Sequence, residues 1–124
     1  MTKLAVIGAG MMGSAIVTGI VEKKVLGPQE IFISDPDTAK VEKLCEKLGV
    51  KAASGNKEAV HEADAVLIAV KPQFLDGVIQ ELKEQISPEA LVMTIVVGVP
   101  ISYYLDAMDI RHIIRIMPNT KHDA

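Results

Sequence analysis

The sequence has few of the residues on which disulfide-bonded and metal-binding proteins depend. Its 124 residues include one cysteine, no tryptophan and only 3% aromatic residues. The single Cys45 can form neither an intramolecular disulfide nor, by itself, a zinc cluster. Its place on the apolar stripe of an expected helix predicts a small buried side chain. His61, His112 and His122 are too scattered to suggest a metal site.

The chain also lacks long apolar runs and clustered positive charge. No run reaches the roughly 18 apolar residues of a membrane span, and the N-terminal run that ends at Ile7 is too short for a signal-peptide core. The formal net charge is −3, and lysine and arginine are scattered, whereas nucleic-acid binding needs a basic patch. We therefore expect a soluble, cytoplasmic protein with no membrane or nucleic-acid partner.

Short aliphatic runs alternate with helical patterns along the chain. Hydrophobic residues make up 49% of the sequence, and the length fits one domain. Strands are expected over residues 3–7, 31–34, 50–53, 65–70, 91–97 and 113–117. Helices are expected over 11–23, from Pro36 to a stop at Gly49, from Asn56 onward, over 74–86 with Phe74 on the apolar face, and over 102–108. This alternation predicts an α/β fold, a single doubly wound, Rossmann-type parallel sheet with helices on both faces.

A glycine-rich turn follows the first expected strand. Gly8, Gly10 and Gly13 form the G-x-G-x-x-G pattern directly between a strand and a helix, the context that a dinucleotide-binding turn requires. Gly8 would allow the tight turn, Gly10 would let a pyrophosphate approach the backbone, and Gly13 would let the helix pack closely on the sheet. Unpaired amides at the helix start attract phosphate without a lysine or arginine. A purely structural turn is the alternative, and a Walker-type loop is excluded because no Gly-Lys-Ser/Thr follows.

Polar residues at the carboxyl ends of other strands are further candidates, because ligands of such sheets bind there. Asp35 could accept hydrogen bonds from a ribose 2′-hydroxyl and would repel a 2′-phosphate, which favours NADH without excluding NADPH. Alternatively, Asp35 caps the following helix, as Ser34 or Asp37 also could. Asn56 could likewise act only as a helix cap, and Lys71 could either reach a phosphate or lie in solvent.

Three motifs together resemble those of pyrroline-5-carboxylate reductase. They are Ile7-Gly8-Ala9-Gly10-Met11-Met12-Gly13, then Ala69-Val70-Lys71-Pro72, then Arg115-Ile116-Met117-Pro118-Asn119-Thr120. The resemblance covers the family's N-terminal cofactor domain. We therefore expect a dinucleotide-binding domain over residues 1–120 and a tail over 121–124 that departs from the family pattern. The family's C-terminal helical domain, through which full-length members form homo-oligomers, is expected to be absent.

The resemblance implies a reductase that transfers a hydride from NADPH or NADH to 1-pyrroline-5-carboxylate, a small imino acid, and forms L-proline in proline biosynthesis. It implies that the pyrophosphate lies on residues 7–12, the adenosine ribose near 34–36 and the nicotinamide half between 69–72 and 95–98. The implied cofactor-binding residues are Ile7, Gly8, Ala9, Gly10, Met11, Met12, Gly13, Ser34, Asp35, Pro36, Asn56, Ala69, Val70, Lys71, Pro72, Val97, Gly98 and Asn119.

Besides this tail, the chain departs from the family pattern at two sites. Asp35-Pro36 replaces an Asn-Arg pair whose arginine would bind a 2′-phosphate, and this supports NADH. Val96 and Val97 are bulkier than the family's small residues there, so the nicotinamide could pack differently. No catalytic residue, neither a proton donor nor a substrate clamp, can be assigned. We therefore expect this chain alone to bind dinucleotide and to turn over little or no substrate.

Two other interpretations stay open. A related hydroxyacid or prephenate-type dehydrogenase would have a similar glycine turn but not the paired Ala-Val-Lys-Pro and Met-Pro-Asn-Thr motifs. A non-catalytic module that acts through a protein partner would bind dinucleotide and reduce no substrate.

Overall fold

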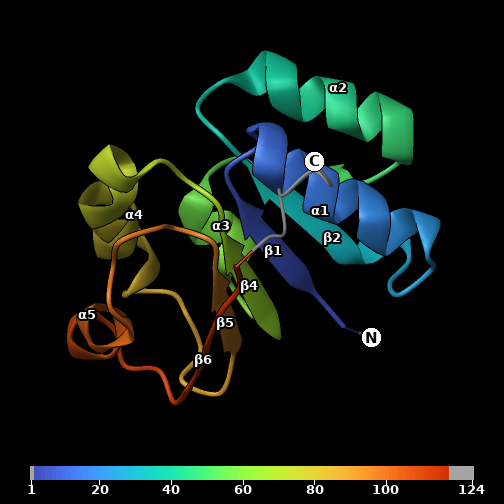
Figure 1. Cartoon of the computed structure of the whole chain (residues 1–124). Coiled ribbons are helices and arrows are strands. Elements are labelled where there is room, and N and C mark those ends of the chain that lie inside the picture. Colours follow the sequence, from blue (N-terminus) through green and yellow to red (C-terminus); the bar gives the residue numbers. More distant parts are fainter. Residues whose placement is uncertain (1, 118–124) are drawn as a thin grey trace, which may run out of the picture.

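A computed structural model describes residues 2–117, and its centre is a six-stranded parallel sheet (Figure 1). The strands are β1 (Leu4–Ile7), β2 (Ile31–Ser34), β3 (Lys51–Ala52), β4 (Ala65–Ile68), β5 (Leu91–Thr94) and β6 (His112–Arg115). Their order across the sheet is β3-β2-β1-β4-β5-β6. The expected Rossmann-type sheet is therefore confirmed.

The sheet changes direction of growth at β1. The chain starts in the middle, moves outward through β2 to β3, and then returns to the other side of β1 for β4. Ile7 pairs with Ser34 on one side and with Ile68 on the other, so β1, β2 and β4 end at the same level. In such sheets the ligand crevice lies beyond the carboxyl ends, where the strand order reverses. The glycine-rich turn leaves β1 at this point.

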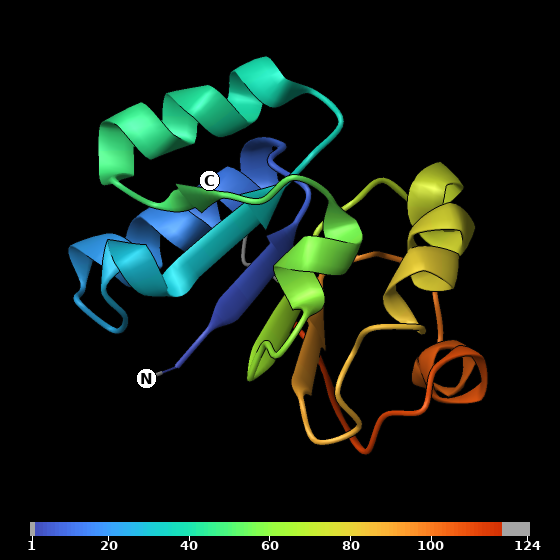
Figure 2. The same cartoon turned by 180° about the vertical axis from the view of Figure 1, so that it is seen from behind.

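Helices cover both faces of the sheet (Figures 1 and 2). One face carries α1 (Met11–Glu22) and α2 (Thr38–Leu48), and the other carries α3 (Asn56–Val60), α4 (Leu75–Leu82) and α5 (Ile101–Ala107). Short 3-10 turns, η1 (Pro28–Glu30) and η2 (Pro72–Phe74), precede β2 and α4. Gly49 ends α2 with a φ of 83°, as expected for a glycine C-cap.

The core has two halves because neighbouring residues of a strand point to opposite faces. Leu4 and Val6 pack on the α1 and α2 side, whereas Ala5 and Ile7 pack on the α3, α4 and α5 side. All four are nearly inaccessible to solvent. A strand buried on both faces has no polar alternation, which is why the sequence shows continuous aliphatic runs.

Three strands end two or more residues earlier than expected. The strands expected over 65–70, 91–97 and 113–117 end at Ile68, Thr94 and Arg115. The aliphatic pattern runs on because residues beyond the ladder still pack: Val96 is buried and Val70 lies against the same core. An apolar residue after a strand end therefore does not distinguish pairing from packing.

Four predictions about single residues were wrong or only partly right. Pro36 lies before α2 and not within it, because the Asp35 carboxylate accepts the amide of Asp37 and holds a separate turn. Phe74 lies in the 3-10 turn η2 and is 59% exposed, not buried on a helix face. Cys45 is only partly buried. The cap of α3 is Gly55, and Asn56 is its first helical residue.

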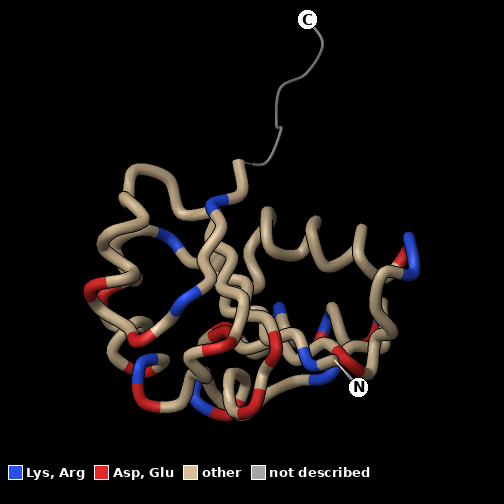
Figure 3. The backbone as a smooth tube through the Cα atoms, turned by 90° about the horizontal axis from the view of Figure 1, so that it is seen from below, with Lys and Arg blue, Asp and Glu red and all other residues tan. Residues whose placement is uncertain are grey.

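Lys and Arg positions are interspersed with Asp and Glu positions along the tube of described residues (Figure 3). Within residues 2–117, no helix is long and apolar enough to cross a membrane. The same part of the chain contains no group of three potential metal-binding His, Cys, Asp or Glu residues.

Candidate functional site

The glycine-rich turn is shaped by two close backbone contacts. Gly8 has a φ of 111°, and a Cβ there would lie 2.4 Å from the Ala69 carbonyl oxygen of the neighbouring β4 end. A Cβ on Gly13 would lie 2.8 Å from the Gly8 carbonyl oxygen and 3.1 Å from Ala69 Cβ. Both positions are therefore closed to a side chain, for the reasons expected from the sequence.

Gly10 differs from its two neighbours. Its φ of −73° suits any residue, and a Cβ there would meet no atom within 4 Å. Gly10 is the N-cap of α1, and the first helical bond runs from the Ser14 amide to the Gly10 carbonyl. The amides of residues 11–13 consequently have no acceptor within the helix. With no acidic residue in its first turn, the start of α1 is open and favourable to a negative group.

Asp35 connects the end of β2 to this turn. Its Oδ2 accepts the Ala9 amide at 2.7 Å, and its Oδ1 accepts the Asp37 amide at 2.8 Å. A carboxylate offers about four acceptor positions, so each oxygen retains capacity for another donor. Asp35 does not cap α2, whose N-cap is Asp37 without a side-chain bond.

A hydrogen-bond chain crosses the same region. Ser34 Oγ donates to Asn56 Oδ1 at 2.7 Å, and Asn56 Nδ2 donates to Glu81 Oε1 at 2.8 Å. These residues come from β2, α3 and α4, so the chain connects three elements across the carboxyl ends. Asn56 thus uses its amide for long-range bonds and not as a helix cap.

Two hollows meet at these residues. The larger has a volume of about 620 Å³ and the smaller about 480 Å³. Both are lined by Ser34, Asp35, Pro36, Asn56 and Glu81. The larger extends over the glycine turn and the end of β4, and the smaller continues toward the end of β3. Together they form a crevice across the carboxyl ends of the strands.

Most of the predicted cofactor-binding residues line the larger hollow. They are Ile7, Gly8, Gly10, Ser34, Asp35, Pro36, Asn56, Ala69, Val70 and Lys71. Ala9 and Gly13 are buried in the turn, while Met11, Met12, Pro72, Val97 and Gly98 lie outside the lining. Asn119 falls outside the described residues.

Several lining residues were not predicted from the sequence. Lys40 and Glu81 occupy polar positions of helices, which ordinarily indicate only a solvent-facing surface. Phe74 faces the hollow from the 3-10 turn η2. A polar residue in the first turns of α2 was the one available signal for Lys40, because that helix begins at the ligand edge.

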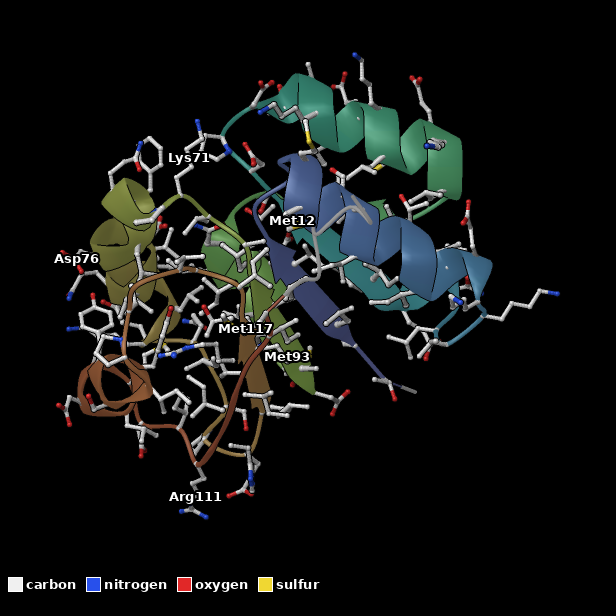
Figure 4. All side chains as sticks on the ribbon, viewed as in Figure 1. Met12, Lys71, Asp76, Met93, Arg111 and Met117 are labelled. Atoms are coloured by element: carbon white, nitrogen blue, oxygen red, sulfur yellow. The ribbon has the colours of Figure 1, made fainter. Side chains whose placement is uncertain are left out.

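Lys71 follows β4 at the same edge. It is exposed, lines the larger hollow and precedes η2. Figure 4 shows it between α4 and the pair α1 and α2, whereas Arg111 lies at the opposite end of the sheet. Lys71 and Lys40 are the cations of the hollow's described lining, and Asp35, Asp37 and Glu81 are its acidic residues.

Comparisons with known proteins agree with this architecture. Residues 3–98 match the family described as NADP oxidoreductase, coenzyme F420-dependent. The pyrroline-5-carboxylate reductase of Methanosarcina acetivorans is 40% identical over 118 residues, which is 94% of this chain and 44% of that protein.

Solved structures give the same result. A pyrroline-5-carboxylate reductase from Coxiella burnetii has a TM-score of 0.89 and 31% identity, covering 96% of this chain and 44% of that one. The Plasmodium falciparum pyrroline carboxylate reductase with NADP bound has a TM-score of 0.81 and 27% identity, covering 96% and 43%.

The match covers nearly all of this chain but less than half of each relative. The chain spans about 44% of the length of the curated relatives it matches, and residues 3–98, which match the family model, contain the glycine turn, the crevice and the first five strands. The chain therefore belongs to the family of NADP oxidoreductases described as coenzyme F420-dependent, and within it corresponds to the N-terminal NAD(P)-binding domain of pyrroline-5-carboxylate reductases.

Proposed function

We propose that this chain binds NAD(P)H, with a preference for NADH, and that it serves as the cofactor domain of a pyrroline-5-carboxylate reductase. The observation that carries the proposal is the open space at Gly10 in front of the unpaired amides of α1, beside a hollow of about 620 Å³. A glycine kept only for a tight turn would have a positive φ or a crowded Cβ, and Gly10 has neither.

The residues of the crevice fit a dinucleotide in a defined orientation. The pyrophosphate would lie on the start of α1, where backbone amides and the helix dipole favour negative charge. The adenosine ribose would lie against Asp35 at the end of β2, with the adenine in the smaller hollow that leads to β3. The nicotinamide half would then lie beyond β1, over the ends of β4 and β5.

In the full-length protein, the bound cofactor would supply a hydride to the imine carbon of 1-pyrroline-5-carboxylate, while the ring nitrogen takes up a proton and L-proline forms. The residues of this chain contribute by binding and orienting. The α1 amides fix the phosphates, Asp35 fixes the ribose, and Ala69, Val70 and Lys71 form the wall toward the nicotinamide half.

The preference for NADH follows from the charge at the end of β2. The Asp35 carboxylate would accept the ribose 2′-hydroxyl with its remaining lone pairs. A 2′-phosphate would instead meet the Asp35 carboxylate, in a hollow whose lining also includes Glu81 and, as cations, Lys40 and Lys71. Like-charge repulsion therefore disfavours NADPH.

Calorimetric titration with NADH and NADPH tests the proposal. We expect the wild type to bind NADH more tightly, and Asp35→Asn to narrow the gap between the two cofactors because the repelling charge is removed. Asp109→Asn removes an exposed acid at the opposite end of the sheet and is the matched control. Equal or tighter binding of NADPH by the wild type would contradict the proposed preference, and no binding of either cofactor would contradict the proposed function.

A further inference from the structure

Two hydroxyl groups meet in the dry core next to the proposed nicotinamide half. Thr94 is the last residue of β5 and Tyr104 lies in the middle of α5, and neither side chain is accessible to solvent. Their oxygens lie 2.7 Å apart. Burial raises the pKa of Tyr104, so its hydroxyl stays protonated and hydrogen-bonded. Burying two hydroxyl groups costs free energy unless they are hydrogen-bonded to each other. Neither hydroxyl has a role in the cofactor binding proposed above.

The pair is connected to the turn that follows β5. The Val96 amide donates to Thr94 Oγ1 at 3.2 Å, so the threonine hydroxyl binds Tyr104 on one side and the turn on the other. The Val96 side chain is buried, whereas Val97 is 75% exposed and Gly98 has a φ of 84°. The turn is therefore held to the core at Val96, and residues 97–98 face the solvent.

The exit of the turn is also held. Arg115 Nη2 at the end of β6 donates to the Val99 carbonyl at 2.6 Å. At the entry, the Ile95 amide donates to the Ile68 carbonyl at the end of β4. Both ends of the turn are thus bonded to neighbouring strands. Between them, the Val96 amide is bonded to the Thr94 hydroxyl.

The position of this turn decides what it could contact. With the adenosine over β2 and the pyrophosphate at α1, the second nucleotide extends across β4 toward β5. The turn after β5 lies there, level with Ile68 because Ile68 pairs with Thr94.

We propose that Tyr104 is a positioning residue for the nicotinamide half of the cofactor, acting through Thr94 on the turn of residues 95–98; this rests on the proposed function. Tyr104 has no exposed surface and touches no ligand itself. Its hydroxyl holds the Thr94 side chain in the rotamer that accepts the Val96 amide. Without it, the threonine can rotate, and the turn loses a fixed place against the nicotinamide.

Titration of the whole chain with NADH and with ADP-ribose tests the inference, because ADP-ribose lacks only the nicotinamide. In Tyr104→Phe we expect NADH affinity to fall by roughly fivefold, as loss of one buried hydrogen bond would allow, and ADP-ribose affinity to stay unchanged. Tyr103→Phe is the matched control. It removes a hydroxyl group from the same helix, but this hydroxyl donates to Asp76 of α4 and makes no bond to the turn.

A second pair of variants separates positioning from folding. Thr94→Ser keeps the hydroxyl and should retain the wild-type ratio of the two affinities, whereas Thr94→Val should reproduce the loss seen in Tyr104→Phe. Equal losses for NADH and ADP-ribose, or no loss for either, would overturn the positioning role. If the wild type binds neither ligand, the proposed function fails first and the inference fails with it.

Discussion

Replacing Gly10 by valine separates ligand binding from folding more cleanly than any other change in the turn. Gly10 is the N-cap of α1 with an extended backbone, and a Cβ there meets nothing within 4 Å. The folded chain therefore has room for the new side chain. The room that it fills is the space in which a pyrophosphate would approach the amides of α1.

The expected effect on stability is small because two contributions oppose each other. Removing a glycine at a compatible backbone conformation stabilises by about 0.4–1 kcal/mol through the unfolded chain. An apolar N-cap is less favourable than glycine by a similar amount, roughly 0.5–1 kcal/mol. The free energy of unfolding should therefore change by less than about 1 kcal/mol.

The expected effect on binding is large. Charge-assisted hydrogen bonds contribute about 1.5–3 kcal/mol each, and a valine side chain would keep the phosphates away from at least one amide. Loss of one such bond corresponds to a decrease in NADH affinity of about tenfold or more. Binding should be measured by calorimetry and stability by urea unfolding on the same preparation.

Gly19→Ala is the matched control for Gly10→Val. Gly19 lies in the interior of α1, and a Cβ there also meets no atom within 4 Å. The helix should gain about 1 kcal/mol from the alanine, and NADH affinity should not change. If Gly10→Val bound NADH as tightly as the wild type, the start of α1 would not be the phosphate site and the reasoning from the glycine turn would be refuted.

The remaining predictions concern folding. Gly13→Ala should lower the free energy of unfolding by about 1–3 kcal/mol, because its Cβ would lie 2.8 Å from the Gly8 carbonyl oxygen and the helix must move; unchanged stability would contradict the close packing. The Asp76 carboxylate, which accepts the hydroxyl of Tyr103, raises the pKa of Tyr103 to about 12 from an ordinary value of 10. The folded chain therefore holds this proton more tightly than the unfolded chain does. In urea titrations, the difference in the free energy of unfolding between wild type and Tyr103→Phe should be largest below pH 10 and should shrink as the pH rises through about 12. A difference that does not change with pH would contradict the bond.

The local part of this architecture could be predicted from the sequence, because each signal depends on neighbours in the chain. The strand over 31–34 matches β2 at both ends, and Gly49 ends α2 as expected. The ends of β4 and β5 were placed too late, since Val70 and Val96 are apolar for reasons of packing and not of pairing.

The site was predictable where its residues lie at the ends of strands and not where they lie on helices. Asp35 follows β2, and the topology alone places it at the ligand edge. Glu81 lies at a polar position of α4, and only the packing of α4 beside α3 brings it to Asn56. No pattern within one helix contains that information, because the bond joins residues that are 25 positions apart.

The two bonds of Asp35 change how its own substitution must be interpreted. Because Oδ2 accepts the Ala9 amide and Oδ1 accepts the Asp37 amide, the carboxylate connects the glycine turn to the turn that precedes α2. An asparagine has one acceptor oxygen, so Asp35→Asn leaves one of these amides without its partner. That loss disturbs the phosphate turn equally for NADH and NADPH. Absolute affinities of the variant therefore report on the turn, and only the difference between the two cofactors reports on the charge that the 2′-phosphate would meet.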